Sequence, residues 1–179
     1  MPDSQGPPNR KSPRRNGYDY GQAASYMVTI DVDYREWRFG SIDQGMVRLN
    51  AAGRMVELEW LALPTRFLGI ALDEFVVMPD HVHGILFIGT EPGIQPPTLS
   101  RVMQAFKSIT AVTYGRGIRA GAYPPLRRAW WQRSFHDRVL LDERDLEIAR
   151  EYVANNPGKW QDDVDWRRWE RNRVSKGPD

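Results

Sequence analysis

The stretch FVVMPDHVHGILFI, residues 75–88, predicts two β-strands joined by a tight turn. Apolar and β-branched residues fill both halves, as is typical of strands in a buried sheet. Pro79-Asp80 separates the two runs and favours a turn, because proline presets one backbone angle and aspartate can bond its own backbone. Residues 68–78 and 81–88 are therefore expected to be consecutive strands.

Further elements are predicted on the N-terminal side of this stretch. A strand is expected over residues 24–33 and a small hairpin over 37–49. Asn50 is a helix-capping residue, and the helix that it begins should end near Leu63, with Pro64 as its stop.

On the C-terminal side, capping and breaking residues predict three elements: a helix from Thr98 or Ser100 to about Tyr114, a strand over 130–141, and a last helix from Asp142 to about Asn156, before Pro157. Without the hairpin and the last helix, the order is βαββαβ. This order predicts an α+β protein with a ferredoxin-like antiparallel sheet, to which the small hairpin and a C-terminal helix are added. Such a fold is common and names no function.

The ends of the chain differ in composition from its middle. Residues 1–22 are rich in Pro, Gly and Arg and are expected to form a flexible basic arm. Residues 23–160 are expected to form a single domain, followed by a polar tail with Trp and Arg over 161–179.

Composition excludes several kinds of protein. The chain has no cysteine, which removes disulfides, thiolate zinc sites and cysteine nucleophiles and fits a reducing compartment. The sequence contains no stretch of about 18 apolar residues, so no membrane span is predicted. The first residues lack the apolar core of a signal peptide, so a cytoplasmic protein is expected.

Charge is distributed unevenly along the chain. Residues 101–138 carry eight basic side chains and one acidic one, Asp137. Of the 25 basic residues, 21 are arginine, whose planar guanidinium pairs with two phosphate oxygens at once. This block indicates either a polyanionic partner or an ordinary solvated surface.

Two of the three histidines form the sequence His81-Val82-His83 within a predicted strand. Residues two apart in a strand point to the same face, so the two imidazoles should lie side by side while Val82 enters the core. They could bind a metal ion or be structural or surface histidines. With no cysteine available, Mg²⁺ or Mn²⁺ is favoured over structural zinc.

The last predicted helix carries Tyr152 and Asn156, which are four residues apart and hence on one face. The sequence pattern alone favours an ordinary half-buried helix tyrosine at position 152.

Several motifs together resemble those of a known family: MPDHVHGIL at 78–86, FKS at 106–108, WQRSFHDR at 131–138, and EYV at 151–153 followed by NNP at 155–157. In order and spacing they resemble the single-tyrosine HUH transposases, and in particular the REP-associated tyrosine transposases. The resemblance spans about residues 14–160.

The resemblance implies a ferredoxin-like fold and a metal-dependent enzyme that cleaves and rejoins single-stranded DNA at palindromic repeat hairpins. It implies that His81 and His83 bind Mg²⁺ or Mn²⁺, with Asn156 as third ligand, directly or through water. It also implies that Tyr152 attacks the scissile phosphate and forms a 5′-phosphotyrosine. Relatives work as monomers or as homodimers.

DNA contacts are expected from the basic arm and the basic block, at Arg14, Arg15, Lys107, Arg116, Arg119, Arg127, Arg128, Arg133, His136 and Arg138. Trp130 and Trp131 could stack on unpaired bases, but packing in the core is the favoured prediction for them. A protein of this kind would be associated with the nucleoid.

Two alternatives remain open. One is a domesticated protein that binds repeat hairpins without moving DNA. The other is a small hydrolase that uses a metal held by His81 and His83. The basic block argues against the hydrolase, as does the absence of a clear general-base carboxylate beside the histidines. If Tyr152 is not the nucleophile, Tyr114 and Tyr123 are the next candidates.

Overall fold

The computed structural model describes residues 24–175, with side chains described as far as Trp160. The elements in chain order are β1 (Ala24–Asp31), the 3-10 turn η1 (Asp33–Arg35), β2 (Gly40–Asp43), β3 (Met46–Leu49), α1 (Ala51–Leu61), α2 (Leu63–Arg66), β4 (Ile70–Met78), β5 (His81–Ile88), α3 (Leu99–Arg119), β6 (His136–Leu140) and α4 (Glu143–Ser175).

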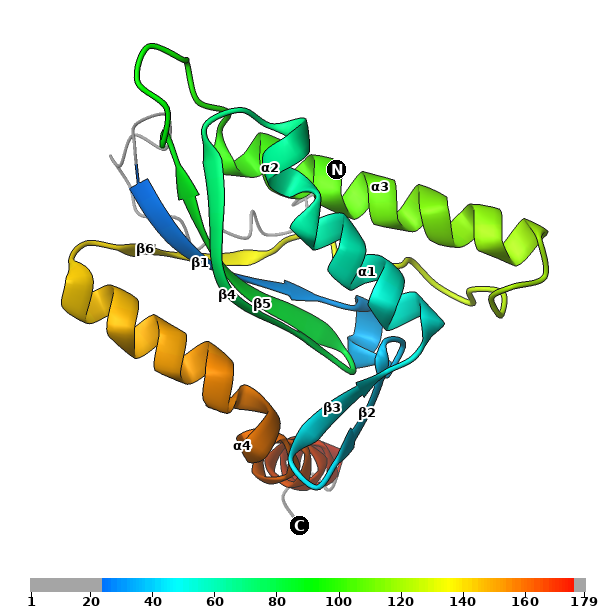
Figure 1. The fold of residues 1–179 in the computed structure, drawn as a ribbon. Coiled ribbons are helices and arrows are strands. Elements are labelled where there is room, and N and C mark those ends of the chain that lie inside the picture. Colours follow the sequence, from blue (N-terminus) through cyan, green and yellow to red (C-terminus); the bar gives the residue numbers. More distant parts are fainter. Residues whose placement is uncertain (1–23, 176–179) are drawn as a thin grey trace, which may run out of the picture.

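The main sheet has four strands in the order β4-β5-β1-β6, and every neighbouring pair is antiparallel. Figure 1 shows α1 and α3 on one face of this sheet and α4 on the other. With β2 and β3 set apart as a two-stranded hairpin, this arrangement is the ferredoxin-like one that the element order predicts. The predicted fold class is confirmed.

Alternation along β5 divides the core between the two faces of the sheet. Val82, Leu86 and Ile88 belong to the larger core under α1 and α3. Ile85 belongs to a smaller core with residues of α4, with Phe87 packed against it. Successive side chains of a strand point to opposite faces, so His81 and His83 lie on the α4 face. This places the two histidines under the tyrosine-bearing helix.

A close approach at Gly84 fixes the distance between β5 and α1. A side chain at this position would meet the indole of Trp60, with a Cβ only 2.2 Å from its Cζ2 atom. Trp60 is fully buried and also packs edge-to-face on Phe106 of α3, with ring centroids 5.3 Å apart. Gly84 therefore leaves room for the indole of Trp60, which packs the sheet against α1 and α3.

The predicted capping residues are confirmed, whereas the ends of the three predicted helices differ from the prediction. Pro64 does not stop a helix but stands in the first turn of α2, where its missing N–H costs nothing. Helix α3 continues beyond Tyr114 to Arg119. Gly117 lies inside this helix, where a Cβ would clash with the ring of Tyr123.

The predicted strand over 130–141 is shorter in the structure. Only residues 136–140 join the sheet as β6, because Trp130 and Trp131 turn into the large core. The prediction that these two tryptophans pack in the core is confirmed, since both are buried.

Helix α4 was expected to end at Asn156 and instead continues through Pro157 to Ser175. In Figure 1 its orange and red parts run in different directions, which agrees with the bend that an interior proline causes. Trp160, one turn after Asn156, is buried and holds the helix against the site beyond the proline.

Among the residues that the structure describes, no helix has the length and apolarity needed to cross a membrane. The predicted basic arm over 1–22, with Arg14 and Arg15, lies outside the described residues.

Candidate active site

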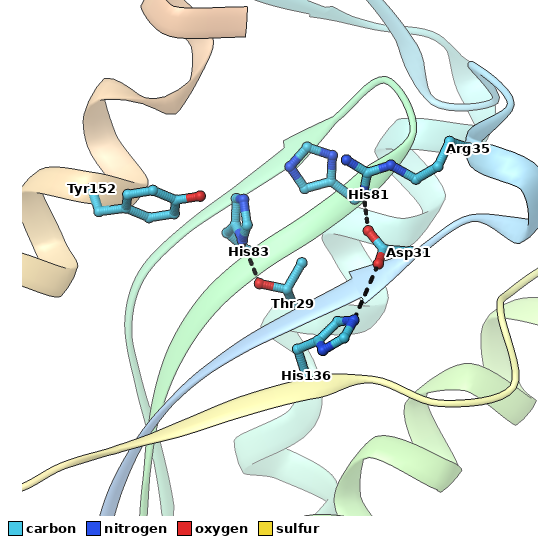
Figure 2. A pocket seen from close by; sticks show the side chains of 7 residues that line it. All are labelled: Thr29, Asp31, Arg35, His81, His83, His136 and Tyr152. Atoms are coloured by element: carbon cyan, nitrogen blue, oxygen red, sulfur yellow. Dashed lines mark hydrogen bonds and ion pairs between the residues drawn. The ribbon is translucent and has the colours of Figure 1, made fainter. Parts of the chain in front are cut away.

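A pocket of about 250 Å³ opens on the α4 face of the sheet. It is lined by Thr29, Asp31, Arg35, His81, His83, His136 and Tyr152. Figure 2 shows these side chains converging from β1, η1, β5, β6 and α4. The structure thus brings together four residues that the sequence singled out, His81, His83, His136 and Tyr152.

The strand register explains how this pocket is built. His81 of β5 lies opposite Asp31 of β1, and His83 lies opposite Thr29. Thr29 also lies opposite His136 on the other side of β1. Because paired residues of neighbouring strands point to the same face, one row of side chains crosses three strands.

The two histidines are buried and each is oriented through its Nδ1 atom. Their ring centroids are 4.4 Å apart. The Nδ1 of His83 is 2.8 Å from the hydroxyl of Thr29, and the Nδ1 of His81 is 2.5 Å from a carboxylate oxygen of Asp80. A carboxylate can only accept, so His81 donates from Nδ1 and its lone pair lies on Nε2. Partners of this kind typically fix the tautomer of metal-binding histidines.

Arg35 ties two buried carboxylates together beside the histidines. Its guanidinium contacts Asp31 and lies 3.1 Å from the second oxygen of Asp80. Tyr34 and Arg35 both adopt φ of 55°, the left-handed region that side chains usually avoid. This strained turn brings the guanidinium back over the end of β1, and strain of this kind often accompanies functional sites.

Tyr152 reaches the pocket from α4. Its ring meets that of His83 at a centroid distance of 5.2 Å, nearly perpendicular. Figure 2 shows its hydroxyl oxygen pointing toward the two histidines. The side chain is 45% exposed, so its hydroxyl remains accessible to a ligand from solvent.

Asn156 lies between two residues of α4 that touch the histidines. Tyr152, one turn before it, contacts His83, and Trp160, one turn after it, contacts His81 at a centroid distance of 5.7 Å. Residues four apart share a helix face, so Asn156 faces the same pair of imidazoles. It is 5% exposed, and its side-chain oxygen is buried without a hydrogen-bond partner among the described residues.

These donors fit a divalent metal ion. A buried amide oxygen without a partner is costly unless it binds something, and Mg²⁺ or Mn²⁺ prefers oxygen with some imidazole nitrogen. Within the described residues, no three His, Cys, Asp or Glu side chains gather in a metal-binding arrangement. The buried side-chain oxygen of Asn156 lies on the helix face that meets His81 and His83.

The sequence did not identify Thr29, Asp31, Arg35 or Asp80 as site residues. The alternation in VTIDV, residues 28–32, contains a signal for two of them, because its polar residues all fall on one face. The expected absence of a general-base carboxylate beside the histidines is wrong, because Asp31 lines the same pocket. Its distance of 50 residues from His81 in the sequence concealed this.

Most of the predicted DNA contacts within residues 101–138 are exposed, and some of these exposed side chains also contact other protein groups. Arg116, Arg119, Arg127, Arg128, Arg133, His136 and Arg138 are exposed. Arg128 lies over the ring of Tyr34, with its guanidinium carbon 3.9 Å from the centroid, and Arg138 pairs with Asp145 at 2.7 Å.

Lys107 has a different environment from these arginines. Its ammonium donates to the carbonyl oxygens of Gln132, Arg133 and Ser134 at 2.5, 3.0 and 3.3 Å. Burial lowers its pKa. The three bonds anchor the segment that leads into β6 and so help to place His136.

Helix α4 is attached to the sheet edge two residues before Tyr152. Arg150 donates to both carboxylate oxygens of Asp73 in β4, with the shortest distance 2.6 Å. The hydrogen bond from Arg150 holds the pKa of Asp73 below its ordinary value of 3.8, although burial opposes the shift. This pair helps to fix the rotation of the helix that carries the tyrosine.

We expect Asp73→Asn to lower the free energy of unfolding by up to about 1 kcal/mol at pH 7, the upper range for a partly exposed ion pair. Because the folded-state pKa is depressed, the stabilisation is present above about pH 3.8 and disappears as the pH falls through the folded value. Thermal unfolding of both proteins at pH 7 and at pH 3 measures this. A difference that is equal at both pH values would contradict a role for the charge.

Fold and pocket together define a class of protein: a ferredoxin-like sheet with two histidines of one strand facing a tyrosine of the last helix. The family model described as "Transposase IS200 like" matches residues 65–156, about half of the chain. The matched segment contains both histidines, Tyr152 and Asn156.

Individual proteins are similar as well. The chain is 32% identical over 165 residues to an uncharacterized protein of Haemophilus influenzae, covering 87% of this chain and 92% of that protein. It shares its fold with a solved REP-associated tyrosine transposase bound to a REP hairpin, at 17% identity and a TM-score of 0.57, over 83% of this chain and 74% of that one. The chain belongs to the IS200-like transposase family and is an enzyme of the transposase class. The resemblance found in its motifs is confirmed.

Proposed function

We propose that this transposase is a metal-dependent single-strand DNA endonuclease and strand transferase that acts through a 5′-phosphotyrosine at Tyr152. The observation that carries the proposal is the contact between Tyr152 and His83 in an open pocket that His81 also lines. A structural tyrosine would have no need to present its hydroxyl to two oriented imidazoles.

His81, His83 and Asn156 are the residues proposed to hold Mg²⁺ or Mn²⁺. A bound divalent ion polarises the scissile phosphate and offsets the negative charge of the transition state. Thr29 and Asp80 keep the imidazoles in the required orientation. Asn156 supplies an oxygen that is already desolvated and buried.

Tyr152 would supply the attacking oxygen of the cleavage step. The phenolic oxygen of Tyr152 attacks phosphorus and loses its proton to solvent, while the bond from phosphorus to the 3′-oxygen breaks. The covalent link conserves the energy of the phosphodiester, so a 3′-hydroxyl of another strand can reverse the step and join DNA. This accounts for strand transfer without a nucleotide cofactor.

The proposed substrate is DNA with a palindromic hairpin and an adjoining single strand. The REP hairpin bound by the transposase of similar fold supports this choice. The exposed arginines of residues 101–138 supply guanidinium groups for the phosphate backbone.

The proposal is tested with a 3′-labelled hairpin oligonucleotide and Mn²⁺. The label stays on the fragment that begins with the 5′-phosphate, so the protein should carry it on a denaturing gel. Binding of hairpins from its own genome without any adduct would instead favour a domesticated binding protein.

A second test asks whether the basic residues of 101–138 contact the phosphates of the DNA backbone. The logarithm of DNA affinity should fall with the logarithm of salt concentration by about 0.7 for each phosphate contacted on a single strand. Arg127→Ala with Arg128→Ala should flatten this slope by up to about 1.4 if each side chain contacts one phosphate. Fluorescence anisotropy over a range of salt concentrations measures the slope.

The matched control removes two exposed arginines outside the basic block, by Arg54→Ala with Arg144→Ala. It should leave the slope unchanged. Equal slopes for both double variants would show that DNA binds on another face of the protein.

A further inference from the structure

We propose that His136 is a further catalytic residue, the general acid that gives a proton to the departing 3′-oxygen. This inference rests on the proposed phosphotyrosine reaction, which leaves open how the leaving oxygen is protonated. Its starting point is the position of His136, which lines the pocket yet belongs to β6, away from the paired histidines and the tyrosine.

The strand order places His136 opposite the nucleophile. Tyr152 contacts His83 on β5. Thr29 of the neighbouring strand β1 lies opposite His83 on one side and opposite His136 of β6 on the other. Two strand spacings separate β5 from β6, about 10 Å. Figure 2 shows Tyr152 and His136 on different sides of His83 and Thr29. In phosphoryl transfer the attacking and leaving oxygens stand roughly in line on opposite sides of phosphorus.

The other lining residues are less suited to this task. Arg35 cannot give up a proton in a protein and already contacts Asp31 and Asp80. A threonine hydroxyl is a very weak acid, and the one present, Thr29, is engaged with His83. Histidine is the side chain whose proton exchanges readily near neutral pH.

The surroundings of His136 agree with proton transfer. Its side chain is 62% exposed, so it can reach a bound strand and exchange protons with water. Its Nε2 atom is 3.9 Å from Asp31 Oδ2, within the distance at which a charged imidazole would form an ion pair with that carboxylate. Arg35 holds the other oxygen of Asp31, so the partner of His136 is itself fixed in place.

The bond between Tyr152 oxygen and phosphorus forms, the bond between phosphorus and the 3′-oxygen breaks, and the electron pair of that bond stays on the oxygen. The imidazolium of His136 gives its Nε2 proton to this oxygen and becomes neutral. In strand joining, the neutral ring takes the proton back from the attacking 3′-hydroxyl.

The test uses a substrate with sulfur in place of the bridging 3′-oxygen at the cleavage site. A thiolate is a far weaker base than an alkoxide and leaves without a proton. With Mn²⁺ present for both substrates, His136→Gln should slow cleavage of the oxygen substrate by about 100-fold or more. It should cleave the sulfur substrate at close to the rate of the unaltered protein.

Three comparisons make the result specific. Arg144→Gln removes an exposed positive charge outside the pocket and should cleave both substrates normally. Tyr152→Phe should fail on both. Thermal unfolding should show that His136→Gln folds normally, because the imidazole is mostly exposed.

If His136→Gln slows cleavage of both substrates equally, His136 is only a DNA contact. If it slows neither, His136 takes no part in the reaction. Either result overturns the proposal. If the unaltered protein forms no adduct with either substrate, the proposed function itself fails, and the role of His136 fails with it.

Discussion

Tyr152→Phe is expected to abolish covalent capture of DNA while leaving folding and DNA binding intact. The substitution removes only the hydroxyl, which is the proposed attacking atom. Because the side chain is 45% exposed, the free energy of unfolding should change by no more than about 1 kcal/mol. Denaturing gels with a 3′-labelled hairpin, anisotropy with the same hairpin and thermal unfolding measure the three quantities.

Tyr114 provides the matched control for this experiment. It is buried, donates to the carbonyl of Pro124 at 3.0 Å and stacks between the rings of Tyr123 and Trp130. Burial raises the pKa of its phenol, which opposes formation of a nucleophilic phenolate. Tyr114→Phe should therefore retain the adduct. An adduct that persists in Tyr152→Phe would show that another residue attacks.

The second large effect is expected at His83. His83→Ala should remove the stabilisation that Mn²⁺ gives to the folded protein, because one of three proposed ligands is lost. At a metal concentration of 100 times Kd, binding stabilises a folded protein by about 2.7 kcal/mol, or roughly 5–10 °C in Tm for a chain of this size. Thermal unfolding with Mn²⁺ and with chelator measures the difference.

The other histidines separate ligand loss from general damage. His136→Ala should keep the full Mn²⁺ response, since His136 is not a proposed ligand, and Asn156→Ala should show a reduced one. His81→Ala should lose the response and also unfold more easily without metal, by about 1–3 kcal/mol, because Asp80 is buried and loses a partner. A normal Mn²⁺ response in His83→Ala would rule out the proposed metal site.

The sequence predicts those parts of the site that depend on local periodicity. The alternation of His81, Val82 and His83 was sufficient to place two imidazoles on one face of a strand. The spacing of Tyr152 and Asn156 was sufficient to place them on one helix face, and the helix caps at Asn50 and Asp142 were recognisable from residue type alone.

The remaining parts depend on an unusual backbone conformation and on contacts between distant segments. Asp31 meets Arg35 only because two consecutive residues adopt a left-handed conformation that neither residue type favours. Helix α4 passes Pro157 because Trp160 is buried between His81 and Trp37, which are far away in the sequence. Local rules for proline and arginine do not contain this information.

One feature of α4 constrains how the gene can change. Tyr152, Asn156 and Trp160 follow one another at intervals of four residues along a single helix face. An α-helix turns by about 100° per residue, so inserting or deleting one residue between them would rotate everything that follows away from the histidines. Substitutions on the outward side of this helix leave that spacing untouched. Relatives should therefore differ freely in amino acid there, while the number of residues between the tyrosine and the tryptophan stays the same.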